Sequence, residues 1–105
     1  MELNIIIDDY SMILEVADTF LAQSTDAFQR LDRGMDHGVQ VGANWVESPT
    51  QLQRCQVAAD KLLTALETAN ENLAMLSAGY ILSRMPDIIR VRIDTSGELH
   101  ETSFE

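Results

Sequence analysis

The sequence has a single cysteine, Cys55, among its 105 residues, so it cannot form an internal disulfide. Such low cysteine usage is typical of a reducing compartment, and a cytoplasmic location is therefore expected. Cys55 falls on the apolar face of a predicted helix, and the adjacent Arg54 points away from that face. Without a nearby cation to stabilise the thiolate, Cys55 is expected to be a buried structural thiol.

Basic side chains are also scarce. Seven of them stand against 17 acidic ones, which gives a formal net charge of −10. Such a chain is repelled by nucleic acids and by anionic membrane surfaces, so neither is expected as a direct partner. Long apolar runs are missing too, because none approaches the ~20 residues that span a bilayer. With 46% hydrophobic residues, the chain is nevertheless expected to fold as one domain over residues 1–105.

The sequence lacks the short motifs of common catalytic and metal sites. It has no glycine-rich phosphate loop, no Cys-x-x-Cys pair, no His-Glu-x-x-His zinc motif, no nucleophile elbow and no calcium-binding loop. Asp32, Asp36 and His37 lie close together in the sequence, but no further ligand follows at a metal-binding spacing, and we interpret them as solvated polar residues. No catalytic residue, metal site or cofactor is predicted, and a non-enzymatic role is favoured.

The strongest pattern in the chain runs from Ser48 to Met85. Ser48 is the predicted N-cap of a helix, Pro49 is its first residue, and Pro86 ends it. Within these limits, apolar or small residues recur at alternating steps of three and four. This heptad seam, on which the rest of the chain is expected to pack, consists of Leu52, Cys55, Ala59, Leu62, Leu66, Ala69, Leu73, Leu76, Tyr80 and Ser83.

An unbroken helix over this stretch is too long for a compact chain. About 36 residues would measure roughly 50 Å, against an expected width of ~30 Å. The helix must therefore fold back or protrude and meet a second copy. Thr68 and Glu71 resemble a capping box, and Asn70 tolerates the left-handed conformation that ends a helix. Because the seam keeps its phase here, a continuous or kinked helix is favoured, with a split near Asn70 as the alternative.

A second amphipathic helix is predicted from residue 8 or 9 to residue 33. Its apolar face carries Phe20 and Phe28, which the leucine-rich helix would cover, and Gly34 is its expected C-cap. Residues 3–7 include three consecutive isoleucines, which suit a β-strand. The first turns of the helix, with Asn4 as N-cap, are favoured over that strand.

The remaining segments are a loop and a hairpin. Residues 34–47 hold three glycines and the only tryptophan, Trp45, and are expected to form an irregular connection. Residues 88–104 alternate apolar and polar side chains around a tight turn at Ser96 and Gly97, which predicts a β-hairpin. The predicted register places Ile93 opposite His100, Val91 opposite Thr102, Ile89 opposite Phe104 and Arg92 opposite Glu101.

These elements predict a mainly α fold of two long amphipathic helices with a C-terminal β-hairpin. The edge of residues 88–95 is expected to be open for strand addition. The favoured function is a small interaction or assembly protein that forms a homo-oligomer, preferably a dimer, through the seam residues Leu62, Leu66, Leu73, Leu76 and Tyr80. A heterologous protein partner would contact Trp45, Arg90 and Arg92, a small basic patch with one large aromatic.

Two other functions are left open. The net charge of −10 suits an acidic regulator that binds a basic protein surface. The glycine-bearing segment around Trp45 suits a small enzyme or ligand carrier with a pocket at that place. Salt-sensitive association with a basic partner would favour the first, and quenching of Trp45 fluorescence by small ligands would favour the second.

Overall fold

The chain begins with a β-hairpin where the sequence predicted a helix. In the computed structural model, which describes residues 1–105, strand β1 (Glu2–Ile7) pairs antiparallel with strand β2 (Tyr10–Glu15). The turn is formed by Asp8, whose φ is +51°, and Asp9. The helical prediction for this segment is wrong because its apolar residues also fit a period of two. The β-branched isoleucines favour that period.

The predicted mainly α fold is wrong: the fold is mixed α/β, with four helices and six strands in two sheets. Four strands form the main sheet, in the order β2-β1-β5-β6. Strand β5 (Arg90–Ile93) runs parallel to β1, and the short strand β6 (Ser103–Phe104) runs antiparallel to β5. The predicted edge at residues 88–95 is therefore wrong, because β5 has a neighbour on both sides. The open edges of the sheet belong to β2 and β6.

The C-terminal hairpin forms, but its predicted register is wrong by two residues. Val91 lies opposite Phe104 and Arg92 lies opposite Ser103. A tight two-residue turn does not form because Asp94 organises a longer connection. Its carboxylate accepts hydrogen bonds from the N–H groups of Ser96 (3.0 Å) and Glu98 (2.9 Å), and a short 3₁₀ helix (Leu99–Glu101) follows.

The leucine-rich stretch is two helices joined by a turn. Helix α3 (Gln51–Glu67) and helix α4 (Glu71–Arg84) form a helical hairpin, so the favoured continuous helix is wrong and the split near Asn70 is correct. At the turn Ala69 has a φ of +54°, and the Asn70 side chain accepts from the N–H of Leu73 at 3.1 Å. These two features end one helix and cap the next. We call this hairpin the α3–α4 hairpin.

Helix α3 begins two residues later than predicted. Its N-cap is Thr50, which forms a capping box with Gln53 (3.2 Å and 2.9 Å), and not Ser48. The reciprocal pair satisfies two backbone N–H groups of the first turn. The seam keeps its phase across the helix break because α3 and α4 both turn apolar faces to the same core.

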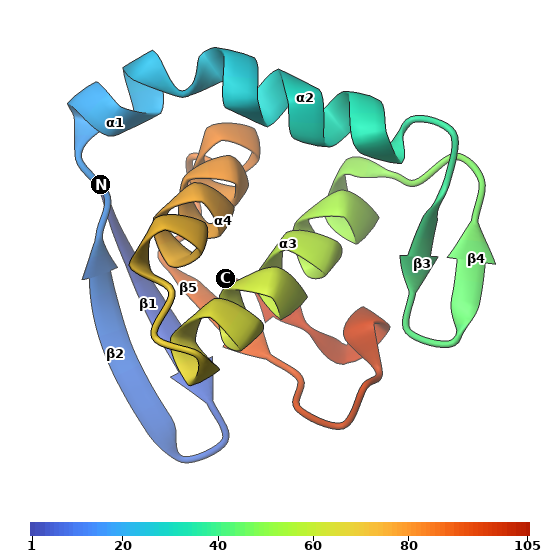
Figure 1. Cartoon of the computed structure of the whole chain (residues 1–105). Helices are drawn as coiled ribbons and strands as arrows, with labels where there is room; N and C mark the ends of the chain where they lie inside the picture. Colours follow the sequence, from blue (N-terminus) through green and yellow to red (C-terminus); the bar gives the residue numbers. More distant parts are fainter.

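Helices α1 (Asp18–Gln23) and α2 (Thr25–Met35) cross over the α3–α4 hairpin, as Figure 1 shows. The single helix predicted for this region is broken at Ser24, and α2 continues through Gly34 rather than ending there. The expected packing of Phe20 and Phe28 on the leucine-rich segment is confirmed at Gly79. A Cβ atom at Gly79 would lie 3.0 Å from Phe28 Cζ and 3.2 Å from Phe20 Cε1, so this helical glycine permits the close approach.

The segment predicted as an irregular loop contains a second, two-stranded sheet. Strand β3 (Val39–Val41) pairs antiparallel with strand β4 (Asn44–Val46). Gly42 lies in the turn with a φ of +61°, and this left-handed conformation favours glycine. This hairpin extends from the side of the molecule where α3 begins (Figure 1).

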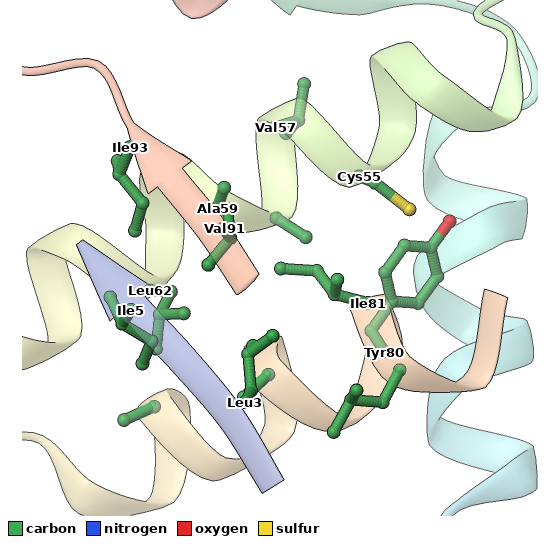
Figure 2. Close-up of a cluster of buried hydrophobic side chains, with 14 of the residues drawn as sticks. Leu3, Ile5, Cys55, Val57, Ala59, Leu62, Tyr80, Ile81, Val91 and Ile93 are labelled. Carbon is green, nitrogen blue, oxygen red and sulfur yellow. The ribbon is translucent and has the colours of Figure 1, made fainter. Parts of the chain in front are cut away.

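The core lies between one face of the main sheet and the α3–α4 hairpin. Figure 2 shows Leu3, Ile5 and Val91 on the strands facing side chains of α3 and α4, and each of these three is fully buried. Cys55 is also fully buried, which confirms its prediction as a structural thiol. The radius of gyration, 12.8 Å, agrees with about 13 Å for a compact chain of this length. None of the helices combines the length and apolar character needed to cross a membrane.

Candidate functional site

Strand β2 presents an open hydrogen-bonding edge, because it ends the main sheet and only one of its sides faces another strand. The N–H of Val16 donates to the carbonyl of Met1 at 2.7 Å, which fixes the direction of the backbone groups next to β1. Backbone groups alternate in direction along a strand. The N–H and C=O groups of Ser11, Ile13 and Glu15 therefore point away from β1, and no other element pairs with them.

A groove of about 320 Å³ lies beside this edge, between β2 and the turn of the α3–α4 hairpin. Alanines at 65, 69 and 74 leave the space open, since larger side chains there would fill it. Seven of the nine lining residues are hydrophobic. We call this hollow the β2 groove; it is lined by Met12, Leu14, Ala65, Leu66, Ala69, Asn70, Glu71, Ala74 and Met75.

A second hollow borders the β2 groove at the first turns of α4. This hollow shares Glu71 and Met75 with the groove and reaches Phe20 on α1.

The elements around the β2 groove carry acidic but hardly any basic groups. Residues 1–29 and 62–83, which include β1, β2, α1 and the whole helix turn, contain no lysine or arginine. The same ranges contain six and two acidic residues, among them Glu15 beside the open edge and Glu71 in the groove. The only cation here is the amino group of Met1, 3.6 Å from Glu15 and 3.3 Å from Asp18. The local potential is therefore negative.

The opposite end of the α3–α4 hairpin carries a network of charged side chains. Asp32 of α2 accepts hydrogen bonds from Tyr80 Oη (2.5 Å), from Arg84 Nη2 (2.7 Å) and from Arg54 Nη1 (3.2 Å). Arg54 also donates to Asp36 at 2.8 Å. The polar hollow at this place has a volume of about 300 Å³ and is lined mainly by the same side chains. We call these five residues the Asp32 network.

The charges of the Asp32 network balance within the chain, because its two arginines form ion pairs with its two aspartates. Burial alone would raise the pKa of Asp32, but the hydrogen bonds from Tyr80, Arg84 and Arg54 outweigh burial and hold that pKa below its ordinary value. Burial, followed by the bond to Asp32, raises the pKa of Tyr80. Burial raises the pKa of the neighbouring Cys55 thiol to about 12. None of these three groups is tuned to exchange a proton near neutral pH, and the network is suited to holding α2 on α3 and α4.

The predicted seam residues are divided by the fold. Leu62 and Tyr80 are buried inside the chain, with exposed fractions of 0% and 1%. Leu66 lines the β2 groove, and Leu73 and Leu76 line a small apolar hollow between α2 and the α3–α4 hairpin. These three leucines are half-buried. Self-association through the seam stays a prediction, and only these three of its five residues remain accessible to a second copy.

The three residues predicted for a heterologous partner do not lie together as one patch. Trp45 is on β4 with 62% of its surface exposed, and its ring lies against Gly38, where a Cβ atom would be 2.5 Å from Trp45 Cζ2. None of the surface hollows is lined by Trp45. Arg90 and Arg92 lie on β5, on the uncovered face of the main sheet, and both pair with Glu105 at 2.9 Å and 2.7 Å.

Sequence reasoning missed the open edge of β2 and the groove beside it. One signal was present, because Tyr10, Met12 and Leu14 alternate with Ser11, Ile13 and Glu15 at a period of two. The contact between β2 and the helix turn carried no such signal, since it joins segments more than fifty residues apart.

Comparison with protein-family models, with curated proteins and with solved structures found no match.

Proposed function

We propose that this protein is a non-enzymatic interaction module that binds a protein partner along the open edge of β2 and in the β2 groove. The observation that carries the proposal is the combination of unpaired backbone groups at Ser11, Ile13 and Glu15 with an apolar groove next to them. Exposed edges promote pairing with other chains, and natural proteins protect them with lysine, proline or bulges. Strand β2 has no lysine, proline or bulge over its six residues, and its one charged side chain is Glu15 at its end.

The exposed apolar side chains near this edge support the same proposal. Ile13, on the outer face of β2, is 65% exposed, and on the inner face Tyr10 is 59% exposed while Met12 and Leu14 are half-buried. A bound strand would cover Met12 and Leu14 from the side and satisfy the backbone groups of β2. Removing apolar surface from water contributes about 25 cal/mol per Å², so this contact adds to the hydrogen bonds of the edge.

The acidic charge around β2 favours a basic partner over a neutral one. This agrees with the hypothesis of an acidic regulator that binds a basic protein surface, and it gives that regulator a specific binding surface. A small-ligand role near Trp45 is less well supported, because Trp45 lines no hollow. The single buried cysteine is compatible with work in a reducing compartment such as the cytoplasm.

Site-specific photo-cross-linking in the cell of origin tests the proposed function. A photoreactive phenylalanine analogue is placed at Ile13 or at Met75, and at Asp87, an exposed residue outside the β2 groove, as the matched control. We expect Ile13 and Met75 to give the same discrete cross-linked product and Asp87 to give none. A product of twice the mass identifies a second copy of this chain, and any other discrete mass identifies a different protein.

Two results would overturn the proposal. Identical products from all three positions would show that the cross-links are nonspecific. A complete absence of products from Ile13 and Met75, in cells where the protein is folded and abundant, would show that nothing occupies the groove. Circular dichroism of each purified variant verifies that the fold is intact.

A further inference from the structure

Resting on the proposed function, we infer that the bound segment is an extended strand of a basic partner, with apolar side chains alternating with lysine or arginine, that adds to β2 as a fifth strand. Three features of the molecule define this segment: the direction of the backbone groups of β2, the alternation of its two faces, and the distribution of charge around it.

The backbone sets the conformation of the ligand. Ser11, Ile13 and Glu15 each direct one N–H and one C=O away from β1, at alternate positions along a straight edge. A helix cannot satisfy such a row, because its own backbone groups are paired internally. An added strand lies ~4.8 Å away and presents its groups at the same spacing.

The two faces of β2 set the alternation. On the inner face, Met12 and Leu14 contribute to the wall of the β2 groove, together with Leu66 and Met75 of the helices. Every second side chain of an added strand points to this side, where the groove favours apolar residues. The intervening side chains lie beside Ser11, Ile13 and Glu15, on the face that no helix covers (Figure 1).

The charges set the identity of these intervening side chains. Lysine and arginine can lay their aliphatic stems along the exposed Ile13 and extend their cationic heads toward Glu15 and water. No lysine or arginine occurs in residues 1–29 or 62–83, which surround this edge, and the four arginines of α3, α4 and β5 are paired with Asp32, Asp36 and Glu105. Acidic groups around the site also accelerate encounter with a basic chain.

A second copy of this protein could form hydrogen bonds with the backbone of β2, but it would not supply the positive charge that the site favours. Its own β2 contains no basic side chain, and pairing two edges brings two molecules of net charge −10 together at a side that carries acidic groups and no lysine or arginine. Repulsion between like charges opposes this pairing most strongly at low ionic strength.

Selection from a random library of displayed seven-residue peptides tests the inference. The library is selected on the wild-type protein and depleted on the Ile13→Pro variant, which loses an outward-pointing N–H without losing a bond to β1. We expect enriched sequences to alternate apolar with basic residues. Their affinity should fall roughly tenfold or more on Ile13→Pro, and much less on Ile13→Thr, which keeps the N–H and β-branching.

Chemical variants of the best enriched peptide distinguish strand addition to β2 from nonspecific electrostatic or apolar binding. Methylation of the backbone nitrogens on one edge of the peptide should abolish binding, and methylation on the other edge should change the affinity by less than about threefold. Raising the salt concentration from 50 to 300 mM should weaken binding roughly five- to tenfold. Glu71→Lys should weaken binding, and Asp87→Lys, a matched reversal outside the groove, should not.

Several outcomes would overturn the inference and leave the proposed function standing. These are enrichment of acidic or unpatterned peptides, equal sensitivity to methylation on both edges, a failure to enrich any peptide, or a dimer in light scattering that Ile13→Pro disperses. The cross-linking at Ile13 and Met75 decides the proposed function separately, because it does not depend on the chemistry of the partner.

Discussion

The two ends of the α3–α4 hairpin differ in almost every property. At the end where α3 begins and α4 finishes, Arg54 and Arg84 bind Asp32 and the charges balance within the chain. At the end where α3 meets α4, small apolar residues leave the β2 groove open beside an unpaired strand. The same two helices therefore form a closed polar contact at one end and an open apolar one at the other.

This difference shows which groups of a small acidic protein are available for binding. Charged side chains attract attention in a sequence, but Arg54, Arg84, Arg90 and Arg92 are all paired within the chain. The groups that remain free to bind a partner are the unpaired backbone N–H and C=O groups of β2 and the apolar surface beside them. In this molecule four of the seven basic side chains stabilise the fold, and we propose that recognition depends on an edge, a groove and excess negative charge.

The sharpest test of the open end compares two neighbouring prolines. Leu14→Pro removes an N–H that points to β1, and it should reduce the free energy of unfolding by about 3 kcal/mol or more. Ile13→Pro removes an N–H that points to solvent, and it should cost about 1 kcal/mol, mainly from backbone strain. Urea denaturation of both variants measures the difference. Equal losses would show that the edge of β2 is not open in the way described.

The closed end is tested by removing the charge that its arginines share. Asp32→Asn leaves Arg54 and Arg84 short of a counterion in a partly buried place, and it should lower the free energy of unfolding by about 2–3 kcal/mol. The matched control, Asp87→Asn, alters an exposed aspartate outside any ion pair and should change it by less than about 0.5 kcal/mol. A loss as small as that of the control would show that the Asp32 network does not hold α2 in place.

Low pH should remove the stabilisation that the Asp32 carboxylate gives to the fold. Because the pKa of Asp32 in the folded protein lies below its ordinary value of 3.8, its carboxylate stabilises the fold fully above that pH. The stabilisation is lost as the pH falls through the lowered pKa. The difference in unfolding free energy between wild type and Asp32→Asn should therefore be constant from pH 7 to about pH 5 and narrow below about pH 4. A difference that widens in acid would contradict the lowered pKa.

The smallest expected effect concerns the turn at the open end. Ala69 has a φ of +54°, a conformation that glycine adopts with less strain. Ala69→Gly should raise the free energy of unfolding by about 0.5–1 kcal/mol in urea denaturation. Ala43→Gly, at a position in the turn between β3 and β4 whose own φ is not positive, serves as the control and should not stabilise the protein. Stabilisation by both changes would show that the gain is not specific to the left-handed residue.

The sequence predicted part of this architecture because some signals are local. The apolar seam located α3 and α4, the period of two located β5, and the position of Cys55 on the seam predicted its burial. The N-terminal strands were missed because Tyr10 to Glu15 fits both a helical and an extended period. Only pairing with Leu3 and Ile5 selects the strand.

The candidate site was not predictable from local patterns. Leu66 was singled out, but for contact with a second copy and not as part of a groove. The β2 groove exists because the helix turns at Ala69 and brings Leu66 next to Met12 and Leu14. That turn depends on a single left-handed residue and on one cap at Asn70, and the continuous phase of the seam concealed both.

Amide hydrogen exchange of the isolated protein, resolved by NMR for residues 11–16, tests the central claim most directly. We expect alternation: the N–H groups of Met12, Leu14 and Val16 are protected, and those of Ser11, Ile13 and Glu15 exchange rapidly until a partner strand is added. Protection of all six in the protein alone would show that the edge is already covered. Rapid exchange of all six would show that β2 does not form a stable strand.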